Sequence, residues 1–89
     1  MAAFIESGTI TGTGATASVQ GKKVGIDLDF SGTATVVVQW SRDGNTWTDL
    51  ADGSFTADGQ KIYEGPSIHL RLNCTAYTND VTWWMQTFA

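Results

Sequence analysis

The chain has 89 residues, of which 42% are hydrophobic, 11% aromatic and 16% charged, and its formal net charge is −4. A chain of this length forms one small domain and buries only roughly 60–65% of the surface that its unfolded form exposes, which argues against a large catalytic cleft. The excess of acidic residues argues against a nucleic-acid partner, because nucleic acid is bound through clustered cations. No run approaches the roughly 18 apolar residues of a membrane helix, so no membrane partner is expected.

The chain begins with Met1–Glu6, which contains no cationic segment followed by an apolar one. We therefore expect synthesis in a cytosol without a secretory signal. Cys74 is the single cysteine, so it has no partner for a disulfide or for a thiolate metal site. No metal and no other cofactor are expected, and the domain must rely on its core or on neighbouring chains.

Helix signals are nearly absent, because thirteen Thr and ten Gly oppose helix formation and no window repeats apolar residues at three and four. Residues 1–20 are expected to form either an extended N-terminal arm or an edge strand. Within them, residues 4–11 are a candidate strand, with Ile5 and Ile10 directed inward on either side of an irregularity at Gly8.

Period-two alternation marks the central strands. Residues 24–30 alternate apolar and polar side chains, and residues 33–40 return as a strand rich in β-branched residues. The Asp43-Gly44 pair between residue 40 and the next strand predicts a hairpin. Asp52-Gly53 and Asp58-Gly59 predict two further turns around a short strand.

Two more strands complete the chain. Pro66 is expected to mark a strand boundary, residues 67–77 alternate again, and residues 81–88 form the last strand. Turns spaced by roughly 8 to 12 residues are typical of an all-β sandwich. The sequence therefore predicts a single Ig-like antiparallel β-sandwich of about seven or eight short strands, formed by residues 1–89 as one domain.

The two adjacent tryptophans of the last strand cannot share a face. One of them is expected in the core with Val81 and Met85, and the other on the opposite side with Thr82. A large aromatic side chain left on the surface favours a contact with another chain. The predicted interface comprises Phe4, Ile5, Trp83, Trp84, Gln86 and Phe88.

Catalytic groups do not converge in the sequence. His69 and Cys74 are five apart on one predicted strand and so point to opposite faces. Asp27 and Asp29 share a face, with carboxylates about 7 Å apart, but nothing nearby completes a glycosidase or calcium site. We read their face as a solvated one and predict that the protein is not an enzyme. A hydrolase built on His69 or on the aspartate pair is the least favoured reading.

The predicted hairpin turn is the second candidate site. In it, Asp43 can accept backbone hydrogen bonds while Gly44 takes a positive φ, and Trp40 and Trp47 flank the turn. Exposed tryptophans on a small β-sandwich can stack on sugars. The residues of a possible ligand contact are Arg42, Asp43, Gly44, Asn45 and Trp47.

Three segments together resemble small β-sandwich virion proteins of tailed bacteriophages. They are TVVVQWSRDGNTWTDL (residues 35–50), the Thr-Ala-containing stretch Phe55–Pro66 with its Glu-Gly turn, and Leu70–Thr78 with its Cys-Thr-Ala-Tyr-Thr strand. The resemblance covers residues 24–82. The chain departs from these proteins at the Trp83-Trp84 pair and in its Gly-Thr-Ala-rich leader.

The resemblance implies a virion structural protein, assembled in the host cytoplasm, and foremost a capsid decoration (cement) protein. Its expected partners are the major capsid protein or other virion proteins, and a homo-oligomer or multi-copy assembly is expected. The alternative is a receptor- or glycan-binding Ig-like module of a head fibre or tail component.

Overall fold

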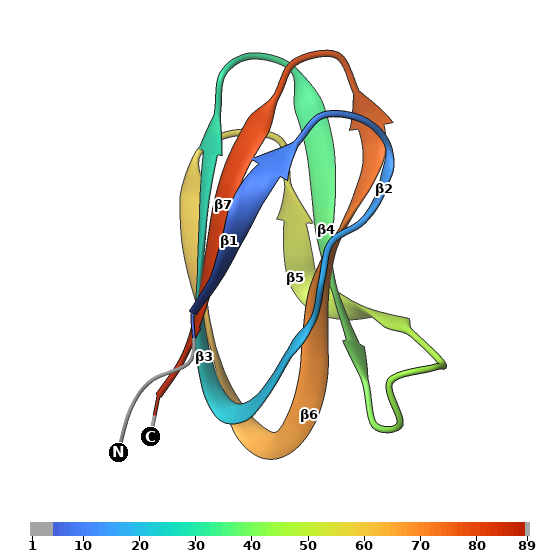
Figure 1. Cartoon of the computed structure of the whole chain (residues 1–89), viewed down its shortest axis with the longest axis vertical. Helices are drawn as coiled ribbons and strands as arrows, with labels where there is room; N and C mark the ends of the chain where they lie inside the picture. The colour runs from blue at the N-terminus through green and yellow to red at the C-terminus, as the bar shows by residue number, and fades with distance from the viewer. Residues whose placement is uncertain (1–4, 89) are drawn as a thin grey trace.

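The computed structural model describes residues 5–88, which fold into seven antiparallel strands joined by turns (Figure 1). The expected all-β antiparallel sandwich is confirmed. No described segment forms a helix that is able to cross a membrane. The strands are β1 (Ile5–Ile10), β2 (Gly14–Ala15), β3 (Val19–Phe30), β4 (Ala34–Ser41), β5 (Thr48–Phe55), β6 (Gly59–Tyr77) and β7 (Val81–Thr87).

The strands pair in the order β1-β7-β3-β6-β4-β5, with β2 beside β6. Two of them are longer than the short strands predicted, since β3 has 12 residues and β6 has 19. Both curve round at the lower end of Figure 1 and so take part in both layers. The first layer contains β1, β7, the second half of β3 and the first half of β6. The second layer contains β2, the start of β3, the second half of β6, β4 and β5.

The bends of β3 and β6 lie opposite each other. The register between these strands shifts between Gly21 and Lys23, and Pro66 lies at the same level of β6. Proline cannot donate to a strand ladder, so it fits where the ladder is interrupted. The Tyr63 hydroxyl donates to the Pro66 carbonyl oxygen at 2.7 Å across the bend. The predicted strand boundary at Pro66 is therefore wrong, because β6 continues through it.

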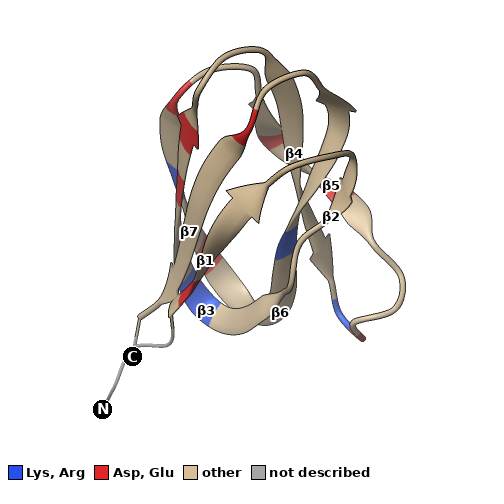
Figure 2. Ribbon diagram, turned by 45° about the horizontal axis from the view of Figure 1, so that its top comes forward, with Lys and Arg blue, Asp and Glu red and all other residues tan. Residues whose placement is uncertain are grey.

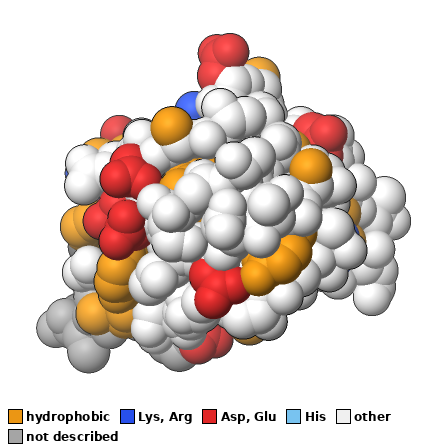
Figure 3. All heavy atoms as spheres, turned by 90° about the horizontal axis from the view of Figure 1, so that it is seen from above, with side chains coloured by type: hydrophobic (Ala, Val, Ile, Leu, Met, Phe, Trp, Pro, Cys, Tyr) orange, Lys and Arg blue, Asp and Glu red, His pale blue; other side chains and the backbone are white. Residues whose placement is uncertain are grey.

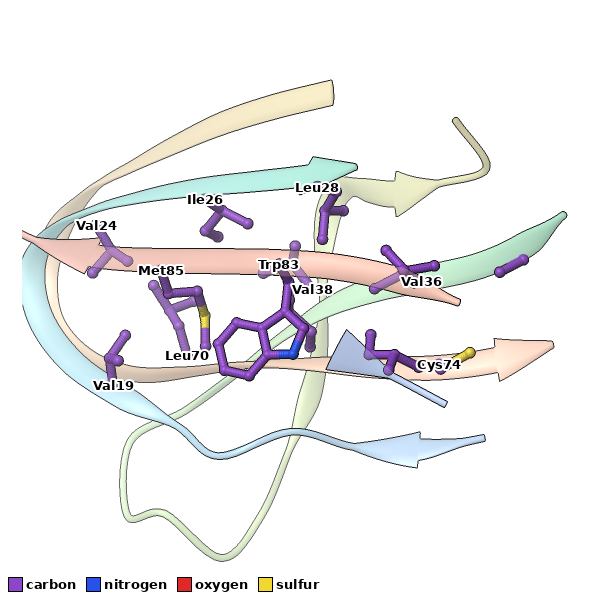
Figure 4. Close-up of a cluster of buried hydrophobic side chains, with 14 of the residues drawn as sticks. Val19, Val24, Ile26, Leu28, Val36, Val38, Leu70, Cys74, Trp83 and Met85 are labelled. Atoms are coloured by element: carbon purple, nitrogen blue, oxygen red, sulfur yellow. The ribbon is translucent and has the colours of Figure 1, made fainter. Parts of the chain in front are cut away.

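Fifteen buried hydrophobic residues form the core between the layers (Figure 4). The period-two predictions for the central strands are confirmed, since alternate residues of β3, β4, β6 and β7 point inward. The core consists of Ile10, Val19, Val24, Ile26, Leu28, Ala34, Val36, Val38, Ile68, Leu70, Leu72, Cys74, Val81, Trp83 and Met85.

The first strand differs from its prediction. β1 pairs with β7 without a register shift, so alternation sends Ile10 inward and Ile5 outward. Ile5 is 57% exposed. Gly8 is a packing site and not an irregularity, because a Cβ there would lie 3.3 Å from Trp83 Nε1. The Trp83 ring thus packs directly against the backbone of Gly8.

The β4–β5 hairpin forms as predicted, with Gly44 at a φ of 79°. Asp52-Gly53, in contrast, is not a turn between strands. β5 runs through it, and residues 50–53 stand opposite the single residue Val38 of β4. Asp52 has a φ of 57°, a left-handed conformation that Asp tolerates better than most residues. The Asp-Gly pair therefore produces a bulge inside one strand.

Candidate interaction surface

The outer surface of the first layer carries the most distinctive cluster of side chains on the molecule. We call it the Trp84 face. Its outward side chains surround Gly25 and are those of Ile5, Lys23, Asp27, Gln60, Ile62, Glu64, Trp84, Gln86 and Phe88. A hollow of about 460 Å³ lies over this face.

All four large hydrophobic residues that are exposed in the described chain line this hollow. Their exposed fractions are 57% for Ile5, 63% for Ile62, 41% for Trp84 and 45% for Phe88. Single apolar residues on a surface are ordinary, but a contiguous group of them marks a contact site. The Trp84 face is therefore the leading candidate for binding another molecule.

The lower part of the face is built around Gly25. A Cβ at this position would lie 3.2 Å from Phe88 Cε1, so the absence of a side chain lets the Phe88 ring cover the strand. The Phe88 amide donates to the Lys23 carbonyl oxygen at 3.0 Å and extends the β7 ladder by one residue. Lys23 Nζ lies 5.4 Å from the Phe88 ring centroid, within range of a cation–π contact. Phe88 is thus held in a defined position at the carboxyl end of β7.

The upper part of the face is acidic. Asp27, Asp29 and Asp58 line a second hollow together with Trp84. Asp58 also accepts a hydrogen bond from the Phe30 amide at 2.7 Å. Figure 2 shows carboxylate positions at the upper ends of these strands and a basic position at the bend of β3, and Figure 3 shows acidic side chains beside exposed hydrophobic ones. Among the described residues no group of acidic, His or Cys side chains is arranged to hold a metal ion.

The structure brings together four of the predicted interface residues: Ile5, Trp84, Gln86 and Phe88. Trp83 belongs to the core, with 5% exposure, so its assignment to the interface is corrected. The physical reason is the alternation of β7, which sends Trp83 inward with Val81 and Met85. Phe4 lies outside the described residues.

Sequence reasoning missed Ile62. Its segment was read as the approach to a turn at Pro66, whereas it forms the first half of β6. The signal was present, because Tyr63 and Lys61 alternate with Ile62 and an inward Tyr63 requires an outward Ile62. Ile62 pairs with Gly25, which places it next to the Phe88 ring.

The hairpin turn, the second predicted site, is held by its own hydrogen bonds. Asp43 Oδ1 accepts from the amides of Thr46 and Asn45 at 2.9 and 2.8 Å, and from the Ser41 hydroxyl at 2.9 Å. The Thr46 and Asn45 amides, followed by the Ser41 hydroxyl, lower the pKa of Asp43 to about 2. Gly44 donates in turn to Ser41 Oγ at 2.8 Å. The carboxylate therefore serves the turn itself, as predicted from the Asp-Gly pattern.

The aromatic rings beside this turn already contact cations. The Arg71 guanidinium lies 4.2 Å from the Trp47 ring centroid, and that of Arg42 lies 5.3 Å from the Trp40 ring. Arg71 is fixed in place because its Nε donates to Gln39 Oε1 at 2.9 Å. One face of Trp47 is thus covered, which leaves less ring surface for stacking on a sugar than an open tryptophan would offer.

Cys74 and His69, the candidate cysteine–histidine pair, lie on opposite sides of the sheet. Cys74 is 2% exposed inside the core, and its thiol lies 3.3 Å from the Ala76 carbonyl oxygen. His69 lies on the outer side of β6, half-buried beneath Gly44 of the hairpin turn. Asp27 and Asp29 both lie on the outer side of β3. His69 and Cys74 therefore do not form a catalytic pair in this fold.

No family model, curated protein or solved structure matches the chain. What the molecule binds therefore has to be inferred from the chemistry of its surface and from the sequence resemblance.

Proposed function

We propose that this protein is a structural component of a tailed-bacteriophage virion, foremost a capsid decoration protein, and that it acts by burying the Trp84 face against a neighbouring protein of the particle. The observation that carries the proposal is the gathering of every exposed large hydrophobic side chain of the described residues into this one face. The assignment to a virion rests on the sequence resemblance to small phage virion proteins. The major capsid protein and other copies of this chain are the expected neighbours.

The size of the patch fits a contact that is repeated many times. At roughly 200 Å² for each large side chain, the exposed fractions of the four residues correspond to about 400 Å² of apolar surface. Burial of that area contributes about 10 kcal/mol at 25 cal/mol per Å². Loss of translational and rotational freedom on association costs about 4–15 kcal/mol. One such contact is therefore marginal, whereas several contacts made at once by an array of copies give stable attachment.

The test compares two tryptophans on the two outer surfaces of the sandwich. Purified protein is added to capsids that lack it, and both occupancy and the temperature of capsid disruption are measured. We expect the unmodified protein to bind and to raise the disruption temperature. Trp84→Ala should lose most of this binding, and Trp47→Ala should keep it.

Each outcome of this comparison has a consequence. Absence of binding by the unmodified protein at high concentration contradicts the proposal. Loss of binding in Trp47→Ala but not in Trp84→Ala would show that the hairpin turn, and not the Trp84 face, contacts the capsid. If Trp47→Ala also abolished binding on a glycan array, the receptor- or glycan-binding alternative would replace decoration. Circular dichroism of both variants verifies that each remains folded.

A further inference from the structure

The outward side chains of the first layer lie in rows that cross the strands. The central row is Ile5, Gln86, Gly25 and Ile62, joined by the pairs Ile5–Gln86, Gln86–Gly25 and Gly25–Ile62. On one side of this row lie Trp84 on β7 and Asp27 on β3, which are paired with each other. On the other side lie Phe88 and Lys23, joined by the Phe88 amide hydrogen bond, and Glu64, which is paired with Lys23.

These rows make the face complementary to itself. Asp27 and Lys23 are each two residues from Gly25 on β3, in opposite directions, and Trp84 and Phe88 are likewise two residues from Gln86 on β7. A two-fold rotation about the central row turns the face onto itself and exchanges the flanking rows. Lys23 then lies over Asp27 of a second copy, and the position of Phe88 on β7 lies over that of Trp84 of that copy, while the Phe88 ring leans onto Gly25 at the axis. Both pairings occur twice, as a symmetric interface requires.

We propose that the Trp84 face closes on the same face of a second copy, around a two-fold axis that runs along the Ile5–Gln86–Gly25–Ile62 row. The inference rests on the proposed function, in which the Trp84 face contacts another protein. It identifies that protein as a second copy of this chain. A rotation about the strand direction midway between β7 and β3 would instead place Trp84 over Asp27, and one midway between β3 and β6 would place Lys23 over Glu64 and Asp27 over Gln60. The axis that crosses the strands is the one that brings Lys23 over Asp27, at the end of the face where Asp29 and Asp58 add negative charge.

The composition of the face matches that of a protein interface. Its centre is apolar and aromatic, and its charged groups lie at the two ends, with Asp29 and Asp58 beyond Asp27 and Glu64 paired with Lys23. A standard interface buries about 800 Å² on each partner. The four apolar side chains supply roughly half of that area, and the polar residues around them supply the rest. Gln86 meets its own counterpart at the centre, where two amides can exchange hydrogen bonds.

The experiment uses the purified protein alone and measures its mass by sedimentation equilibrium over a range of concentrations. We expect a dimer with a dissociation constant in the micromolar range. Asp27→Lys and Lys23→Glu each place like charges opposite each other twice, so each should weaken the homodimer by about tenfold or more. An equimolar mixture of the two variants should regain dimers, because both pairs are then opposite in charge.

A third variant serves as the control. Arg42→Glu changes the charge by the same amount as Lys23→Glu but lies in the hairpin loop of the second layer, so it should dimerise as strongly as the unmodified protein. A monomeric unmodified protein, or a mixture of Asp27→Lys and Lys23→Glu that stays dissociated, would overturn the inference. Because no capsid is present, this result is separate from the proposed function. If the unmodified protein is a monomer and still binds capsids through Trp84, the proposed homodimer is refuted and the proposed attachment to the virion is retained.

Discussion

Trp83 and Trp84 are adjacent in sequence, and the structure predicts opposite consequences for their removal. Trp83 is 5% exposed and packs among core residues and on the backbone at Gly8, whereas Trp84 is 41% exposed. Trp83→Ala leaves a cavity enclosed by both layers, and such substitutions cost about 3–5 kcal/mol. An 89-residue domain has a total stability of about 4–13 kcal/mol. Trp83→Ala should therefore remove a large part of the stability.

Trp84→Ala opens its site to solvent and leaves no enclosed cavity. We expect a cost of about 1 kcal/mol, the central value for point substitutions. In a domain of this size 1 kcal/mol corresponds to roughly 4–8 °C in Tm. Trp83→Ala should thus lower Tm by about 12 °C or more, and Trp84→Ala by less than about 8 °C.

The measurement is thermal and urea unfolding followed by far-ultraviolet circular dichroism, at a concentration low enough to keep the protein monomeric. The urea m-value should be the same for both variants, so that a shift in midpoint reports stability. Equal destabilisation by the two substitutions, or a larger effect of Trp84→Ala, would refute the assignment of Trp83 to the core and Trp84 to the surface.

Two further predictions concern pH. Because hydrogen bonds from the Thr46 and Asn45 amides hold the pKa of Asp43 at about 2, below the ordinary value of 3.8, the unfolded chain binds more protons between these values and stability falls as the pH drops through this window. Asp43→Asn should make the unfolding free energy less dependent on pH between 2 and 4, and an unchanged slope would contradict the role of the turn. The Tyr77 hydroxyl donates to the Asp80 carboxylate, and this hydrogen bond raises the pKa of Tyr77 above 10.0. Asp80→Asn should therefore lower the midpoint of the Tyr77 phenol absorbance titration, and a midpoint that stays in place would show that the contact does not persist in solution.

Much of the local structure was readable from the sequence because its signals act over short distances. Alternation assigned the inward residues of β3 and β4 and one of the two tryptophans of β7 to the core, and the Asp43-Gly44 pair identified the hairpin. The same kind of signal failed at Asp52-Gly53. There the pair has turn chemistry, but pairing with β4 keeps both residues within β5 as a bulge.

The candidate surface was only partly predictable for a related reason. Trp84, Gln86 and Phe88 follow from the alternation of one strand. Ile5 was assigned to the interface and yet expected to point inward, and its direction was settled by the regular pairing of β1 with β7. Ile62 joined the surface because β6 continues through the bend at Pro66 and lies beside β3.

The sequence by itself determined that this chain is an all-β domain, which residues alternate into its core, and that an aromatic side chain is left over at the last strand. Only the tertiary structure decided that the remaining apolar residues gather around that tryptophan, with an acidic group at one end and Lys23, paired with Glu64, at the other. Alternation depends on the geometry of a single strand, so the sequence carries it directly. The neighbours of a strand depend on pairings between segments far apart in the chain, such as Gly25 with Ile62 and with Gln86, and these are fixed only when the whole core assembles.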